Sequence, residues 1–191
     1  MISVVKRSDS KPIKALKRLL CAYHDFEAAS AATNLLISNR EKWEDSVARR
    51  AIETGIVVSY ARPFGENHGL GTLPKHFRVI DDLDAQRVHD RVLLARNALE
   101  AHNDMLERGG LIAGHVRGDD PLNVKITVVD DGHTFWDINT ASLDLFQLKR
   151  LLRMIGIQQK RVEAAAHSAL KKMFDQSPRA PGEYSLGVDF P

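Results

Sequence analysis

Residues 143–174 carry the pattern that most restricts the fold of this chain. They contain no proline, and apolar side chains return every three or four positions. That spacing places the apolar side chains on one face of a long α-helix. The stripe consists of Leu148, Leu151, Leu152, Ile155, Val162, Ala166, Ala169 and Met173. Because such a helix must bury this face against other helices, the sequence predicts a helical bundle.

The start of this last helix is predicted at Thr140 or Ser142, either of which can cap it, with Asp144 in the first turn. Neither candidate cap has Glu or Gln three residues later, so we expect no capping box.

Three further helices are predicted upstream, over residues 12–37, 42–60 and from Asp82 or Asp84 to the glycine pair at 109–110. The first has an expected apolar stripe of Ile13, Leu16, Leu20, Tyr23, Ala31 and Leu35, and the third one of Val88, Val92, Ala95, Leu99 and Leu106. Proline and glycine between residues 61 and 74 predict a long surface loop.

A β-hairpin is predicted over about residues 121–139, because two runs rich in Val, Ile, Thr and aromatic residues flank Asp131-Gly132. Two strands alone are marginally stable, so we expect them to lean on the helices. The prolines of residues 177–191 predict an extended or disordered tail. The expected fold is mainly α: one domain over residues 1–176 with about four long helices and an inserted hairpin.

Composition excludes some partners and compartments. The 27 basic and 25 acidic residues give a formal charge of +2, so no global charge attracts a polyanion. The single cysteine, Cys21, cannot form an internal disulfide, and its apolar setting predicts burial. No segment resembles a signal peptide or a membrane span. We therefore expect a cytoplasmic protein without contact to a membrane.

Common catalytic patterns are absent from the sequence. None of the eight histidines has a recognised metal-ligand spacing, and neither HExxH nor CxxC occurs. No glycine-rich loop between a strand and a helix indicates a nucleotide cofactor, and no nucleophile elbow is present. We expect neither a metal nor a cofactor.

The segment RVHDRVLLARNALEAHND places several polar residues on the third predicted helix. Arg96 and Asn97 are followed, after four residues, by His102. At these residues the chain resembles the HEPN superfamily of helical bundles, whose motif is an arginine, a polar residue directly after it and a histidine several positions on. The segment SYARPFG, followed by a loop and then this helix, is also similar to an arrangement in bacterial members.

The resemblance implies RNA as a partner and, for many members, metal-independent RNA cleavage, as in toxins and antiviral defence effectors. Other members bind RNA, nucleotide or a partner protein without cutting. The residue types suit cleavage, because a guanidinium can hold a phosphate by two hydrogen bonds and an imidazole can move protons. Asn97 could orient either group. An antitoxin or other regulatory protein is a further candidate partner.

Helix geometry separates the two main motif residues. Six residues place Arg96 and His102 about 9 Å apart along the helix axis and about 120° apart around it. One helix therefore presents them poorly to a single phosphate. Two copies facing each other solve this, in agreement with the dimeric site that the resemblance implies, and we predict a homodimer.

Structural alternatives remain for each of these residues. His102 continues an apolar stripe and could be a core histidine, while Arg96 could pair with Glu100 on the helix surface. We predict Arg91, Asn103, Tyr60 and Arg62 as additional RNA contacts. Arg91 fits a solvated charge better than a phosphate contact, and Tyr60 and Arg62 could simply pack where a helix ends.

Overall fold

The computed structural model describes residues 10–39, 41, 47–65, 70–101, 122–128, 134–140, 143–176 and 182. Its elements are α1 (Lys11–Ser38), α2 (Val47–Ala61), the 3₁₀ turns η2 (Arg62–Phe64) and η3 (Lys75–Arg78), α3 (Leu83–Ala101), β1 (Leu122–Val128), β2 (Thr134–Thr140) and α5 (Leu145–Gln176). The chain is mainly helical in these parts, as the sequence predicts.

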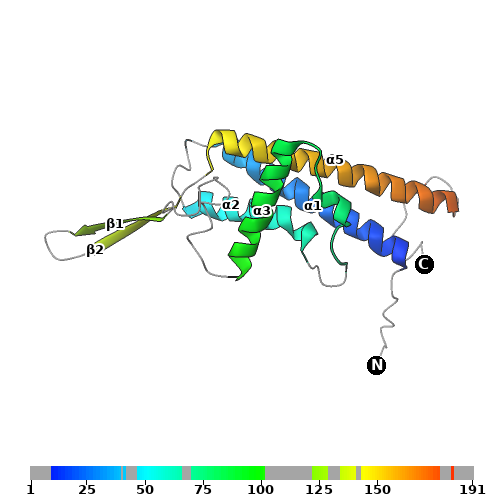
Figure 1. The fold of residues 1–191 in the computed structure, drawn as a ribbon, viewed down its shortest axis with the longest axis horizontal. Helices are drawn as coiled ribbons and strands as arrows, with labels where there is room; N and C mark the ends of the chain where they lie inside the picture. Colours follow the sequence, from blue (N-terminus) through cyan, green and yellow to red (C-terminus); the bar gives the residue numbers. More distant parts are fainter. Residues whose placement is uncertain are drawn as a thin grey trace, which may run out of the picture.

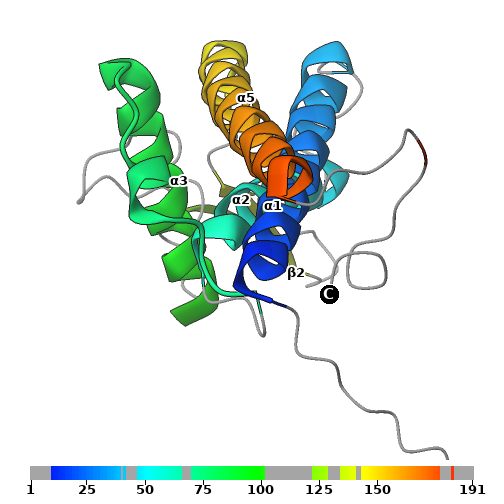
Figure 2. The same cartoon turned by 90° about the vertical axis from the view of Figure 1, so that its right-hand side faces the viewer.

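The helices pack around the longest two. α1 and α5 run side by side in opposite directions and share the most extensive contact in the molecule (Figure 1). α2 packs on α1, and α3 contacts both α2 and α5 (Figure 2). The core between them contains a large set of fully buried side chains, among them Ile13, Leu16, Phe26, Leu36, Ile56, Tyr60, Leu148, Leu151, Met154 and Ile155.

The buried face of α1 differs from the predicted one. The helix buries Ile13, Leu16, Leu19, Ala22, Phe26, Ala29, Thr33 and Leu36. Ala31 and Leu35, expected inside, are exposed, and so is Cys21, whose predicted burial is wrong. Apolar residues lie all around α1, so the spacing permits several stripes, and contact with α2 and α5 selects one of them.

The two later helices begin at aspartates. Asp82 caps α3, because its carboxylate accepts the backbone N–H groups of Asp84 and Ala85 at 3.1 and 3.0 Å. At α5 the predicted caps are wrong: Asp144 accepts the N–H of Gln147, and the amide oxygen of Gln147 accepts the N–H of Asp144, both at 2.7 Å. This reciprocal pair is a capping box with Asp144 as its first residue. No capping box was expected, because the cap was predicted earlier in the chain, at Thr140 or Ser142.

The connection between α2 and α3 is not merely a surface loop, which corrects the prediction. Phe64, Leu73, Phe77 and Ile80 are buried in the core. The two 3₁₀ turns bend the chain so that these side chains point inward. Arg18 of α1 fastens the connection by donating from Nε to the carbonyl of Leu70 at 2.7 Å.

β1 and β2 pair antiparallel, with Leu122 opposite Thr140 and Val128 opposite Thr134. Figure 1 shows this ribbon beyond one end of the helices rather than against them, so the expected support from the helices is not seen. Residues 129–133, including the predicted Asp131-Gly132 turn, lie outside the described residues, and the hairpin as a unit stays a prediction. The predicted end of the third helix and nearly all of the tail also lie outside them.

Among the described residues, no helix combines the length and apolar character needed to cross a lipid bilayer.

Candidate functional site

Arg96 lies near the end of the described part of α3 and is half-buried. Its guanidinium rests on Gly65, so closely that a methyl group at Gly65 would lie 2.8 Å from Nη2 of Arg96. Gly65 closes η2 by donating its N–H to the carbonyl of Arg62 at 3.2 Å. Arg96 therefore contacts the SYARPFG segment, which precedes it by about thirty residues in the chain.

The other motif residues are placed less fully. Asn97 belongs to α3, but its side chain lies outside the described part of the structure, as does that of Glu100. His102 and Asn103 lie outside the described residues altogether. The relative position of Arg96 and His102, and the alternative pairing of Arg96 with Glu100, stay predictions.

Tyr60, predicted as an RNA contact, lies in the core, and its exposed fraction is 0%. Its hydroxyl is 2.6 Å from Nδ1 of His89, which is also completely buried. Phe26 and Phe64 surround the pair, with ring centroids 5.3 and 5.7 Å from that of Tyr60. In this structure Tyr60 is a core residue, and RNA could not reach it without a rearrangement.

His89 was not identified from the sequence as a functional candidate, yet it is the most unusual polar residue of the core. Its Nε2 atom is buried without a hydrogen-bond partner among the described residues. Burial lowers the pKa of His89 to about 4, so the ring is neutral near pH 7. Burial likewise raises the pKa of Tyr60. The spacing of apolar residues could have indicated that His89 is buried. His89 follows Ala85 by four residues and precedes Val92 by three, which places it on the same face of the helix as these two apolar residues, and both are buried.

Gln158 and Arg161 of α5 fasten η3 over this buried centre. The amide nitrogen of Gln158 donates to the carbonyl of Phe77 at 2.7 Å, and Arg161 donates to the amide oxygen of Gln158 at 3.1 Å. Arg161 also donates to the carbonyl of His76 at 2.8 Å. The polar groups around Tyr60 and His89 thus join α5 to the connection before α3, which is a structural role.

Arg62 is exposed, as an RNA contact would have to be, and it forms an ion pair with Asp25 of α1 at 2.7 Å. Asp25 is mostly covered, and this burial raises its pKa although Arg62 opposes the shift. The pair ties η2 to α1. An anion that bound Arg62 would therefore compete with Asp25.

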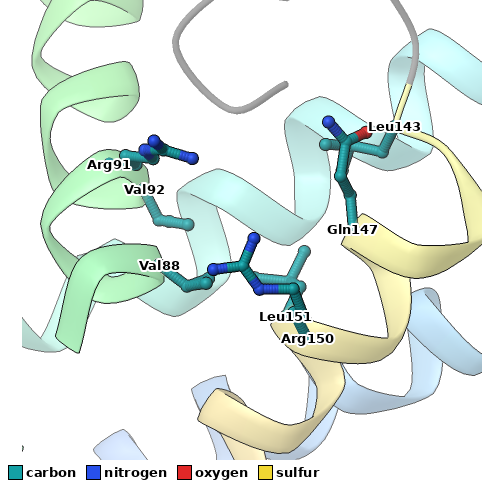
Figure 3. A pocket seen from close by; sticks show the side chains of 7 residues that line it. All are labelled: Val88, Arg91, Val92, Leu143, Gln147, Arg150 and Leu151. Carbon is teal, nitrogen blue, oxygen red and sulfur yellow. The ribbon is translucent and has the colours of Figure 1, made fainter. Parts of the chain in front are cut away.

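Arg91 is exposed and lies on a different side of α3 from Arg96. The two residues are five positions apart, which places their side chains about 140° apart around the helix axis. It lines a pocket between α3 and α5 together with Val88, Val92, Leu143, Gln147, Arg150 and Leu151 (Figure 3). The predicted residues therefore fall into separate places: Arg96 and Arg62 beside η2, Tyr60 inside, and Arg91 at the α3–α5 pocket.

Within the described part of the chain, no three His, Cys, Asp or Glu side chains gather in a way that could hold a metal ion. In comparisons with known proteins, no family model, no curated protein and no solved structure matches this chain.

Proposed function

We propose that this protein is a HEPN-type, RNA-directed protein that cleaves RNA without a metal, through a site completed by a second copy of the chain. The observation that carries the proposal is the contact between Arg96 and Gly65. This contact joins Arg96, the first residue of the motif, to the SYARPFG segment, and the motif and the segment are the basis of the resemblance. Arg96 is half-buried against this turn, as a residue held in one position would be.

The proposed reaction needs three groups. A guanidinium from Arg96 holds the phosphate and stabilises the charge that develops on it. The 2′-hydroxyl oxygen attacks phosphorus while one copy of His102 accepts its proton. The bond from phosphorus to the 5′ oxygen breaks as the other copy of His102 donates a proton to that oxygen. The products are a 2′,3′-cyclic phosphate and a free 5′-hydroxyl.

The first experiment is incubation of the full-length protein with single-stranded RNA in EDTA. We expect cleavage by the wild type and a loss of about 10²-fold or more in rate for Arg96→Ala and for His102→Ala. His167→Ala and Lys160→Ala remove an exposed histidine and an exposed lysine of α5 and serve as matched controls with unchanged rates. Full cleavage by the Arg96 and His102 variants would contradict the proposed site.

A wild type that binds RNA without cutting it would instead identify a non-catalytic RNA-binding module, the second function that the motif suits. Sedimentation of the wild type tests the dimer separately. A monomer at high protein concentration would refute the composite site.

Gly65→Ala tests the position of Arg96 without removing its charge. The new methyl group would displace Nη2 of Arg96, which is the far end of a flexible side chain, so the fold should be kept. We expect a rate at least tenfold lower, because a shift of about 1 Å can reduce catalysis strongly. Gly55→Ala is the control, since nothing lies within 4 Å of a methyl group there. Equal activity of both alanine variants would show that the Arg96–Gly65 contact is not used.

A further inference from the structure

The pocket between α3 and α5 has an apolar floor and a polar rim. Val88, Val92, Leu143 and Leu151 form the floor, while Arg91, Gln147 and Arg150 stand at the rim. Figure 3 shows Arg91 reaching from α3, and Arg150 from α5, toward the space between the two helices. The pocket is shallow and open to solvent. A group presented on a larger molecule can therefore enter from outside.

The aspartates on this side of the molecule are already engaged. Asp84 accepts two hydrogen bonds from Arg150, and Asp82 pairs with Arg153. Asp144 accepts the N–H of Gln147 at the start of α5. Arg91, in contrast, forms no hydrogen bond or ion pair with any other residue that the structure describes. Of the residues that line the pocket, Arg91 and Arg150 carry positive charge and none is acidic, and Asp84 offsets the charge of Arg150.

Arg150 retains donors for a ligand. Its bonds to Asp84 use Nε and Nη2, so Nη1 is not used by that pair. Asp84 holds the guanidinium in one orientation, which lowers the entropy that would be lost when an anion binds. Arg91 and Arg150 can therefore approach one phosphate from two helices.

An exposed aromatic ring stands beside Arg150. Phe146 directly precedes Gln147, is 66% exposed, and lies under the guanidinium of Arg150 with 5.4 Å between the guanidinium carbon and the ring centroid. Proteins that bind single-stranded nucleic acid combine aromatic rings with arginines, because the bases stack on the rings while the phosphates contact the cations. A free phosphate ion would gain nothing from Phe146.

We infer that the α3–α5 pocket binds single-stranded RNA, with a phosphate held by Arg91 and Arg150 and a base stacked on Phe146. This inference rests on the proposed function for the kind of nucleic acid, but not on cleavage. The pocket lies on a different side of α3 from Arg96. It is a second contact that positions the strand and takes no part in the reaction.

The test measures binding of a fluorescent 12-nucleotide single-stranded RNA by anisotropy, with His102→Ala as the parent so that no RNA is cut. We expect Arg91→Ala to weaken binding about tenfold at low salt and to reduce the slope of log affinity against log salt by about one. Phe146→Ala should weaken binding about fivefold or more with little change in that slope. Lys160→Ala, which removes one exposed charge elsewhere on α5, should change affinity less than twofold.

Inorganic phosphate, titrated in a separate arm, distinguishes the two sources of the anion. The assignment predicts that Arg91→Ala weakens the binding of both phosphate and RNA. It also predicts that Phe146→Ala weakens the binding of RNA alone. RNA binding that ignores Phe146, or equal losses for Arg91→Ala and Lys160→Ala, would overturn it. RNA held through Arg91 and Phe146 but never cut by the wild type would refute the ribonuclease alone.

Discussion

Two polar residues of α3, His89 and Arg91, have opposite surroundings, although they are only two positions apart. His89 faces the core, completely buried, with one ring nitrogen on the Tyr60 hydroxyl and the other without a partner among the described residues. Arg91 faces solvent at the edge of the α3–α5 pocket. Polar groups of the first kind affect the free energy of folding, because they have left water. Exposed groups of the second kind are available for a ligand at little cost in stability.

The largest change in stability is expected at the buried ion pair of Arg49 and Glu53, which tests the contrast between buried and exposed polar groups. Arg49 is 5% exposed, its Nε lies 3.1 Å from the carboxylate of Glu53, and its Nη2 donates to the carbonyl of Leu143. Glu53→Ala removes the carboxylate that faces the buried guanidinium of Arg49, and we expect the free energy of unfolding to fall by about 3–5 kcal/mol. Urea denaturation measures it.

Glu163→Ala is the matched control, because Glu163 is exposed on α5, and it should change the free energy of unfolding by less than about 0.5 kcal/mol. Equal effects of the two substitutions would remove the distinction between buried and exposed charge in this fold.

Acid should destabilise the protein through His89. Its pKa is about 4 in the folded chain, against about 6.5 for an unfolded imidazole, so between these values the unfolded chain holds a proton that the folded chain excludes. The contribution to stability is complete above pH 6.5 and is lost as the pH falls toward 4, by up to roughly 3 kcal/mol.

Unfolding measured at pH 7.5 and at pH 5 checks this, with His89→Gln as the reference that cannot titrate. The wild type should lose more stability than His89→Gln between the two values, and the exposed His167→Ala variant should behave as the wild type. Parallel losses in wild type and His89→Gln would show that carboxylates alone cause the acid sensitivity.

The smallest effects are expected from two exposed glycines. Gly55 lies inside α2 with nothing within 4 Å of an added methyl group, so Gly55→Ala should raise the free energy of unfolding by about 0.5–1 kcal/mol. Gly71 has a φ of 73°, which L side chains avoid, so Gly71→Ala should lower it by about 1 kcal/mol. Thermal denaturation of both variants measures this, and shifts of the same sign would contradict the backbone argument.

The sequence predicts the helices well, because their evidence is local. Apolar spacing locates them, and Asp82 marks the start of α3. The contacts that give the buried centre its character are not local: Tyr60 meets His89 from 29 residues away, and Arg49 reaches Leu143 from 94 residues away. Spacing along one helix cannot show such partners. The same limit explains Cys21, since only packing decides which side of α1 is covered.

The hydrogen bond from Arg49 to the carbonyl of Leu143 has one more consequence. Glu53 accepts the N–H of the same residue at 3.1 Å, so α2 holds both polar backbone groups of Leu143, two residues before α5 begins. The position of the chain just before α5 is thereby held by α2. Insertions or deletions within residues 122–140 should be absorbed before α5 starts. Residues 122–140, which follow the proposed catalytic His102, are thus the place where this protein can be lengthened, shortened or exchanged while the bundle keeps its shape.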